Sequence, residues 1–362
     1  MYKESKNTKI LKFNPNDVGN INNNIFGLPF NSSESDVIII PVPWDVTTSY
    51  RQGTSKAPKE IFDASFQIDL FDPFYKDIWK SGISMENVSE YWKQKNKKLR
   101  KQSAKYMKHL AEGVANSNNS DSQKVLTTIN SESLLLNNWV KDQSLFFLDK
   151  NKLVVIIGGD HSVPLGLMHA LAEKNNEFGI LQIDAHADLR NAYEGFQYSH
   201  ASIMFNALKI PQISKLVQVG IRDYCEDEVN IIESDQRVVT FFDRTINKNI
   251  FEGKTWNIIC NDIIASLPKQ VYISFDIDGL NAIYCPNTGT PVPGGLEFNQ
   301  VIYLFEKIVE SGKNIIGFDI CEVNSIKDNE WDCNVAARLL YKTIGMLVKS
   351  NQSFNNDKLT SM

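Results

Sequence analysis

The sequence is poor in cysteine, and its cysteines lack the spacing of a metal-binding knuckle. There are five, none in a Cys-x-x-Cys pair: Cys225, Cys260, Cys285, Cys321 and Cys333. Scattered single thiols are typical of reduced cytosolic proteins, whereas disulfide frameworks and structural zinc sites use paired cysteines. We therefore predict a cytoplasmic protein without disulfides.

Long apolar runs and a surplus of positive charge are also lacking. The first residues contain no apolar signal-peptide core, and no run of about 18 apolar residues occurs. The 362 residues carry a net charge of −5, which argues against a surface built to bind nucleic acid or an anionic membrane. The basic stretch 93–108 lacks an interleaved aromatic platform, so we interpret it as a solvated helix face. We expect neither a membrane nor a nucleic-acid partner.

Short apolar, β-branched segments recur along the chain and alternate with segments of helical length. The first covers residues 37–44, and six more follow residue 153, among them LVVIIGGD, FGILQIDAH and QVYISFDID. Continuous apolar strands alternating with helices indicate a mostly parallel sheet covered on both faces. We predict an α/β fold with at least seven strands in one domain over residues 36–350. An irregular arm (1–35) would precede it and a polar tail (351–362) would follow.

Several of these strands end in carboxylates or histidines. The strand-end groups are Asp160 and His161 after two glycines, Asp184, His186 and Asp188, Asp276 and Asp278, and Asp319 with Glu322. In an open parallel sheet the carboxyl ends of the strands form the ligand-binding edge. Residues two apart in an extended chain project to one side, so Asp184, His186 and Asp188 can face one point. The same holds for Asp276 and Asp278.

A cluster of four aspartates needs cations, because neighbouring carboxylates repel one another and raise each other's pKa. Two divalent ions would balance four carboxylates, and four aspartates with two histidines suit Mn²⁺ better than a thiolate zinc site. Such ions also lower the pKa of a bound water, so that it can attack a carbon near neutral pH. A lone GGDH or DxD is more often a turn or a cap. The three motifs in order, with His161, His186 and His200 within 40 residues, favour a binuclear metal site.

Metallophosphoesterases are a rival class with two metals. Their motifs begin with DxH, continue with GD and end with an Asn-His pair. Here GGDH precedes DxHxD, and the sequence contains no Asn-His pair. The order and content of the motifs therefore argue against that class.

Three motifs resemble the signatures of the ureohydrolases, the family of arginase, agmatinase, guanidinobutyrase and formiminoglutamase: GGDHS (158–162), DAHADLR (184–190) and SFDIDGL (274–280). The similarity, which is strongest to agmatinase-type members, extends to further segments: 41–61, 286–296 and 319–324. The resemblance implies a three-layer α/β/α fold with an eight-stranded parallel sheet and two Mn²⁺ ions per subunit. It also implies hydrolysis of a small guanidino compound to urea and an amine.

The resemblance also implies a role for each strand-end residue. Asp184 and Asp276 would bridge two ions, with His161 and Asp188 completing one set of ligands and His186 and Asp278 the other. The implied catalytic residues are His200, Glu322 and Asp188, and those against the substrate are Glu322, Arg190 and His200. His200 would move protons, and Glu322 would pair with the guanidinium. Asp160 would orient a ligand or the turn.

Departures from the family pattern limit the choice of substrate. Asn281-Ala282 stands where many relatives have Asp-Pro, so that loop can differ. Leu189-Arg190 and Cys225 occupy places where arginases bind the amino-acid end of arginine. We therefore put agmatine first, giving putrescine and urea. If Arg190 points inward, a guanidino acid such as 4-guanidinobutyrate, or formiminoglutamate, is favoured; if it pairs outward with Glu194, agmatine fits.

Residues 67–150 form a helical segment longer than the same region of typical agmatinases. It could shape the mouth of the site, build a subunit interface or decorate the surface. Members of the family are commonly trimers or hexamers, so we expect a homo-oligomer. A non-catalytic, metal-stabilised scaffold is the alternative from another class, and the complete ligand set argues against it.

Overall fold

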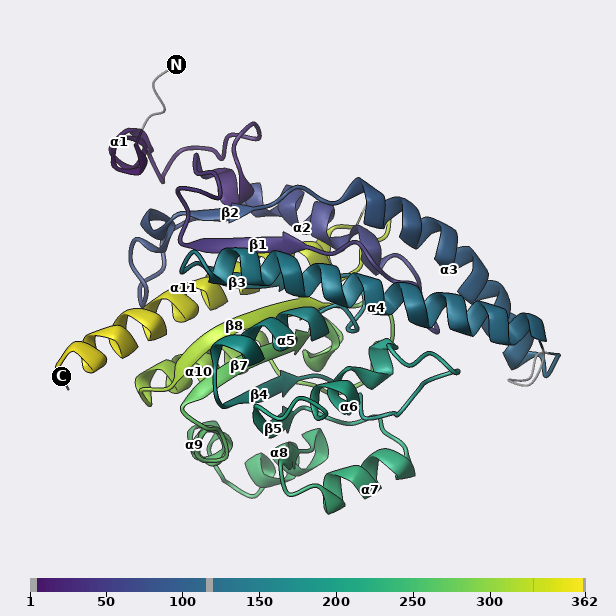
Figure 1. The fold of residues 1–362 in the computed structure, drawn as a ribbon. Helices are drawn as coiled ribbons and strands as arrows, with labels where there is room; N and C mark the ends of the chain where they lie inside the picture. Colours follow the sequence, from purple (N-terminus) through teal and green to yellow (C-terminus); the bar gives the residue numbers. More distant parts are fainter. Residues whose placement is uncertain (1–4, 115–119, 328, 361–362) are drawn as a thin grey trace.

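The computed structural model describes residues 5–114, 120–327 and 329–360, and a sheet of eight parallel strands forms its centre (Figure 1). The strand order is β2-β1-β3-β8-β7-β4-β5-β6. The strands are β1 Val37–Pro41, β2 Ile83–Met85, β3 Leu153–Ile157, β4 Phe178–Ile183, β5 Ile213–Val219, β6 Val238–Phe241, β7 Gln270–Asp276 and β8 Asn314–Cys321. The predicted α/β class and parallel sheet are confirmed.

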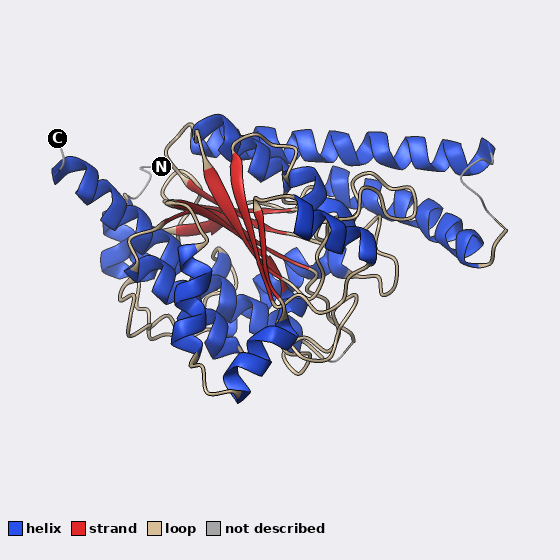
Figure 2. Ribbon diagram, turned by 90° about the horizontal axis from the view of Figure 1, so that it is seen from below, coloured by secondary structure: helices blue, strands red, loops and turns tan. Residues whose placement is uncertain are grey.

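The strands are apolar because helices cover both faces of the sheet (Figure 2). In β1, Val37 and Ile39 belong to one hydrophobic cluster, and Ile38 and Ile40 belong to the other. The helices on the first face are α2 Ala57–Ala64, α8 Asp243–Phe251, α9 Trp256–Ala265, α10 Phe298–Glu310 and α11 Trp331–Thr360. Those on the second are α3 Glu90–Ala111, α4 Ser120–Leu148, α5 Leu165–Lys174, α6 Ile203–Ala207 and α7 Glu226–Ser234.

The segment 67–150 contributes to both the sheet and its covering layer. Its strand β2 pairs with β1 at one edge, and three residues are too few to show a period in sequence. Helices α3 and α4 lie side by side and extend past the sheet, and α4 packs against α5, β1 and β3 (Figure 1). The segment therefore covers one face of the core and is not surface decoration.

Both terminal predictions need correction. The arm 1–35 is not irregular throughout, because it contains α1 (Lys6–Lys12) and buries Ile25, Leu28 and Phe30 in the core. The predicted tail 351–362 is not separate up to Thr360, because α11 continues through that residue and Asn351 donates a hydrogen bond to the carbonyl of Ile315 in β8; residues 361–362 lie outside the described residues. No helix in the described part of the chain has the length and apolar character needed to cross a membrane.

Candidate metal centre

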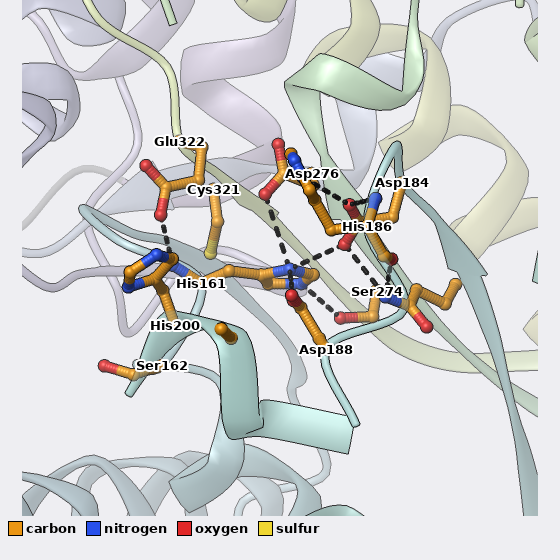
Figure 3. Close-up of polar contacts among 12 residues, drawn as sticks. His161, Ser162, Asp184, His186, Asp188, His200, Ser274, Asp276, Cys321 and Glu322 are labelled. Carbon is orange, nitrogen blue, oxygen red and sulfur yellow. Dashed lines mark hydrogen bonds and ion pairs between the residues drawn. The ribbon is translucent and has the colours of Figure 1, made fainter. Parts of the chain in front are cut away.

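Four adjacent strands deliver polar side chains to one edge of the sheet. His161 lies just beyond β3, Glu322 directly follows β8, Asp276 ends β7 and Asp184 directly follows β4. Since β3, β8, β7 and β4 are consecutive in the sheet, their carboxyl ends converge (Figure 3). The predicted ligand residues are therefore brought together.

The first candidate metal cluster comprises His161, Asp184 and Asp188, whose ligand atoms lie within 4.8 Å of one another. The Nδ1 atom of His161 lies 3.1 Å from Asp184 Oδ2 and 3.0 Å from Asp188 Oδ2. Asp276 stands beside this cluster, with its Oδ2 3.5 Å from the same nitrogen. These four side chains could surround one ion.

The second candidate cluster comprises Asp184, His186 and Asp278. The Nδ1 atom of His186 lies 3.1 Å from Asp278 Oδ2 and 3.6 Å from Asp184 Oδ1. Asp184 thus directs one oxygen towards each histidine, as a bridging carboxylate would. Asp276, the other expected bridge, uses its Oδ1 to accept a hydrogen bond from the backbone N–H of Asp278 at 2.9 Å.

The four aspartates are buried, and no lysine or arginine of the described chain forms an ion pair with them. Their exposed fractions are 0% for Asp184, 4% for Asp188, 3% for Asp276 and 1% for Asp278. Within the described chain, their ion pairs are with His161 and His186 only. Burial and neighbouring Asp184 raise the pKa of Asp188 to about 7, and burial raises the pKa of Asp276 well above its usual value. Carboxylate and imidazole donors with this surplus of negative charge fit divalent metal ions.

Buried polar side chains form a hydrogen-bonded network behind His161, and the sequence alone indicates no role for these side chains. His161 Nε2 lies 2.9 Å from Ser274 Oγ and 3.6 Å from Asp319 Oδ1. Asp319 also accepts a hydrogen bond from the hydroxyl of Tyr272 at 2.6 Å. Such partners fix the ring of a ligating histidine. The available signal was spacing, since Tyr272, Ser274 and Asp276 alternate along β7 and share a face.

The backbone is unusual at two site residues. Asp188 and Glu322 adopt left-handed conformations, with φ of 55° and 59°. Non-glycine residues held there carry strain that is often found at functional sites. Only glycine fits at position 159, because a Cβ atom there would lie 1.8 Å from the carbonyl oxygen of Trp44. The turn that carries His161 therefore packs directly on the segment after β1.

Glu322 and His200 lie beside the ligands (Figure 3). Glu322 Oε1 accepts a hydrogen bond from the backbone N–H of His161 at 3.0 Å, and burial raises the pKa of Glu322 well above its usual value. Burial and the charges of His186 and His161 lower the pKa of His200 to about 3. His200 is therefore neutral near pH 7. Its expected role in moving protons cannot rest on the ordinary pKa of histidine.

A cavity of about 410 Å³ opens onto the site, lined by His186, Asp188 and His200. Its wall carries Arg51 and Arg190 together with Asp223 and Glu228. Besides Asp188, the wall therefore holds two cations and two carboxylates.

Arg190 takes neither of the two orientations exactly as predicted. Its guanidinium lies 4.9 Å from the ring centre of Tyr193, and its Nε lies 3.8 Å from Glu228 Oε2. Of the two alternatives left open by the sequence, the outward pairing with Glu194 is not formed, because Glu228 is the carboxylate beside Arg190. Arg190 lines the cavity, but with its charge balanced by Glu228.

Asn281 and Cys225, the other two departures from the family pattern, make local hydrogen bonds. Asn281 caps its own turn, because its Oδ1 accepts a hydrogen bond from Ile283 N at 3.2 Å. Cys225 precedes α7, where its N–H donates to Glu228 Oε2 at 2.9 Å. The cavity is lined from this loop by Asp223, Tyr224 and Glu228.

Known proteins with similar sequences and folds support the assignment. The chain matches the Arginase family over residues 35–345. It is 31% identical over 314 residues to N(1)-aminopropylagmatine ureohydrolase of Thermus thermophilus, covering 86% of this chain and 90% of that protein. It is 27% identical to the agmatinase of Pyrococcus horikoshii, covering 86% and 92%. In fold it is similar to the agmatine ureohydrolase of Thermoplasma volcanium, with a TM-score of 0.67, 23% identity and coverage of 89% and 93%.

The chain therefore belongs to the arginase family. The predicted family and fold are confirmed, as is the predicted class of enzyme, hydrolases that act on the C–N bonds of linear amidines.

Proposed function

We propose that the chain is a binuclear manganese enzyme that hydrolyses a small guanidino compound to urea and an amine. The observation that carries the proposal is the pair of His/Asp clusters that share Asp184 at the end of a 410 Å³ cavity. The proposed metal ligands are His161, Asp184, His186, Asp188, Asp276 and Asp278. When bound, the two ions would activate water for attack on the amidine carbon.

The chain's own residues would bind and orient the substrate. Glu322 lies next to the ligands, and a carboxylate matches the forked donors of a guanidinium. His200 lines the cavity and, being neutral near pH 7, would accept or donate a hydrogen bond there. Asp188 would take part in both metal binding and substrate binding, because it belongs to the first cluster and lines the cavity.

Agmatine, giving putrescine, is the substrate we put first. Arg190 is balanced by Glu228, so its charge need not exclude a substrate with a distal ammonium group. N(1)-aminopropylagmatine is a second candidate, since relatives at 31% identity carry its name. Guanidino acids and formiminoglutamate remain alternatives because Arg51 and Arg190 both face the cavity.

A substrate panel tests the proposal. Purified, Mn²⁺-loaded protein would be incubated with agmatine, N(1)-aminopropylagmatine, 4-guanidinobutyrate, arginine and formiminoglutamate, with urea and formamide as readouts. We expect the highest kcat/KM for urea release with agmatine. Release of formamide instead would select the formiminoglutamate reaction. Absence of both products, with the metals bound, would contradict the proposal and favour the metal-stabilised scaffold.

We further propose a cytoplasmic homo-oligomer, a trimer or hexamer, as the resemblance of the motifs implies. All five cysteines are unpaired, which suits a reducing compartment. Light scattering after size-exclusion chromatography would give the mass in solution, and a monomer would contradict the oligomer.

A further inference from the structure

The segment between β1 and α2 contacts the backbone of His200 through Thr47. Thr47 is fully buried in it, and its hydroxyl makes two hydrogen bonds. It donates to Asp160 Oδ2 at 3.1 Å and accepts from the backbone N–H of His200 at 3.3 Å. One hydroxyl therefore joins the turn that carries His161 to the segment that carries His200.

Asp160 is itself held firmly, so the link has a fixed base. Its backbone N–H donates to the carbonyl of Trp44 at 2.8 Å. Its Oδ1 accepts a hydrogen bond from the backbone N–H of Ser162 at 3.1 Å, and the Ser162 hydroxyl also donates to it. Thr47 thus bonds to a carboxylate that has little freedom to move.

Helix α3, in the segment 67–150, contacts residues 44–46, which directly precede Thr47. Asn96 is 6% exposed. Its Nδ2 donates a hydrogen bond to Asp45 Oδ1, and its Oδ1 accepts one from the backbone N–H of Asp45, both at 2.8 Å. Ser103 donates to the carbonyl of Val46 at 2.5 Å, one residue before Thr47. Trp92 packs edge-on against Trp44, with ring centres 5.9 Å apart.

We propose that Thr47 is a positioning residue for His200 and that α3 fixes it through Asn96. The inference rests on the proposed function, since it assigns Thr47 to the reaction in which His200 acts. It gives the helical segment 67–150 a part in catalysis at a distance from the substrate. A displacement of a reacting group by about 1 Å can lower a rate by about 100-fold, so a lost backbone hydrogen bond can matter.

The test compares Thr47→Val with Thr48→Val in the full, Mn²⁺-loaded chain. Thr48 is the matched control, because it is also buried but donates only to the carbonyl of Asp45. We expect Thr47→Val to lower kcat by about 10-fold or more, within the range for a displaced active-site group, while KM changes by less than about 3-fold. Bound metal should be unchanged. Thr48→Val should retain the wild-type kcat, and Thr47→Ser should restore it.

Asn96→Leu tests the contribution of α3. It should lower kcat in the same way, and combining it with Thr47→Val should lower kcat little further, because both act through one contact. Lys98→Ala, on the exposed side of α3, is the control and should leave kcat unchanged. Fully multiplicative effects of the two substitutions would overturn the role of α3.

Amide hydrogen exchange separates this inference from the proposed function. A peptide that contains residues 196–203 should exchange faster in Thr47→Val than in Thr48→Val, whether or not a substrate is known. If the wild type releases no urea but the exchange differs, the proposed function fails and the positioning contact stands. Unchanged exchange together with an unchanged kcat would overturn the inference.

Discussion

Asp184 belongs to both candidate metal clusters found in the described residues. Its two oxygens face different histidines, at 3.1 Å and 3.6 Å, and its side chain is fully buried. The other ligands separate into a set around His161 and a set around His186. Substitutions should therefore affect the two ions unequally.

We predict a graded loss of metal from single substitutions. Asp184→Asn should lose both ions, whereas Asp188→Asn and Asp278→Asn should each retain about one, since each removes one of the three cluster residues. Asp276→Asn should lose metal and activity together, because we expect Asp276 to bridge. Metal analysis after loading with Mn²⁺ measures this, with exposed Asp227→Asn as the control. Equal metal content in all variants would contradict the site.

His200→Asn should separate binding from chemistry. His200 is not among the proposed ligands, so both ions should remain, while the rate should fall by about 100-fold, as for loss of one hydrogen bond to the reacting group. Steady-state kinetics with metal analysis checks both outcomes. His109→Asn in α3 is the control, and loss of metal in His200→Asn would contradict the assigned role.

Among the structural elements, the loop after β5 ties two loops of the site together. Arg222 donates hydrogen bonds to the backbone carbonyls of Asp278 at 2.6 Å, Leu280 at 3.2 Å and Val292 at 3.0 Å. Asp278 is a predicted ligand, and Val292 lines the cavity. The guanidinium of Arg222 thus helps to fix the backbone that carries Asp278 of the second cluster.

We predict that Arg222→Lys weakens metal binding selectively at the second cluster. Arg222 also donates through Nη1 to the carbonyl of Gly220 at 3.1 Å; lysine keeps the charge but has one nitrogen, so it cannot bond to Gly220 and to the other three carbonyls at once. The affinity for the second Mn²⁺ should fall by about 10- to 100-fold, and the first should be unaffected. Calorimetric titration measures both. Arg237→Lys, which loses bonds to Asp235 and Leu208 away from the site, should bind both ions normally.

Helix α4 should behave as part of the core. Leu136 is 1% exposed, whereas its neighbour Leu135 is 52% exposed. Leu136→Ala should lower the free energy of unfolding by about 2–5 kcal/mol through the cavity it leaves. Leu135→Ala should change it by less than about 0.5 kcal/mol. Denaturant unfolding compares the two, and equal small effects would make the segment 67–150 dispensable for stability.

For the whole molecule, the metal centre links charge to stability. Four buried carboxylates repel one another in the core, and bound cations would relieve that repulsion. Binding of any ligand to the native state alone adds stability, about 2.7 kcal/mol at a concentration 100 times Kd.

Chelation should therefore lower Tm. We expect EDTA to lower Tm by several degrees and excess Mn²⁺ to restore it, measured by differential scanning calorimetry. Asp184→Asn should lose this response, because it binds neither ion. A Tm that is independent of both EDTA and Mn²⁺ would contradict a structural contribution from the metals.

Much of the sheet was predictable from sequence. Strands such as β3 and β4 are buried on both faces, so their apolar runs are visible without any contacts. The edge strand β2 was missed because three residues show no period. The helix α1 and the end of α11 were missed because their polar sequences look like irregular arms.

The sequence by itself determined the chemistry of the site. Strand-end aspartates and histidines at a spacing of two predict a metal centre, because a parallel sheet collects its carboxyl ends at one edge. Only the tertiary structure decided the partners that come from distant segments. Thr47 under His200, Asn96 on Asp45 and Glu228 beside Arg190 are separated by 153, 51 and 38 residues, and no local pattern encodes such contacts. The physical reason is that packing of helices and loops around the sheet, not sequence spacing, sets which side chains meet there.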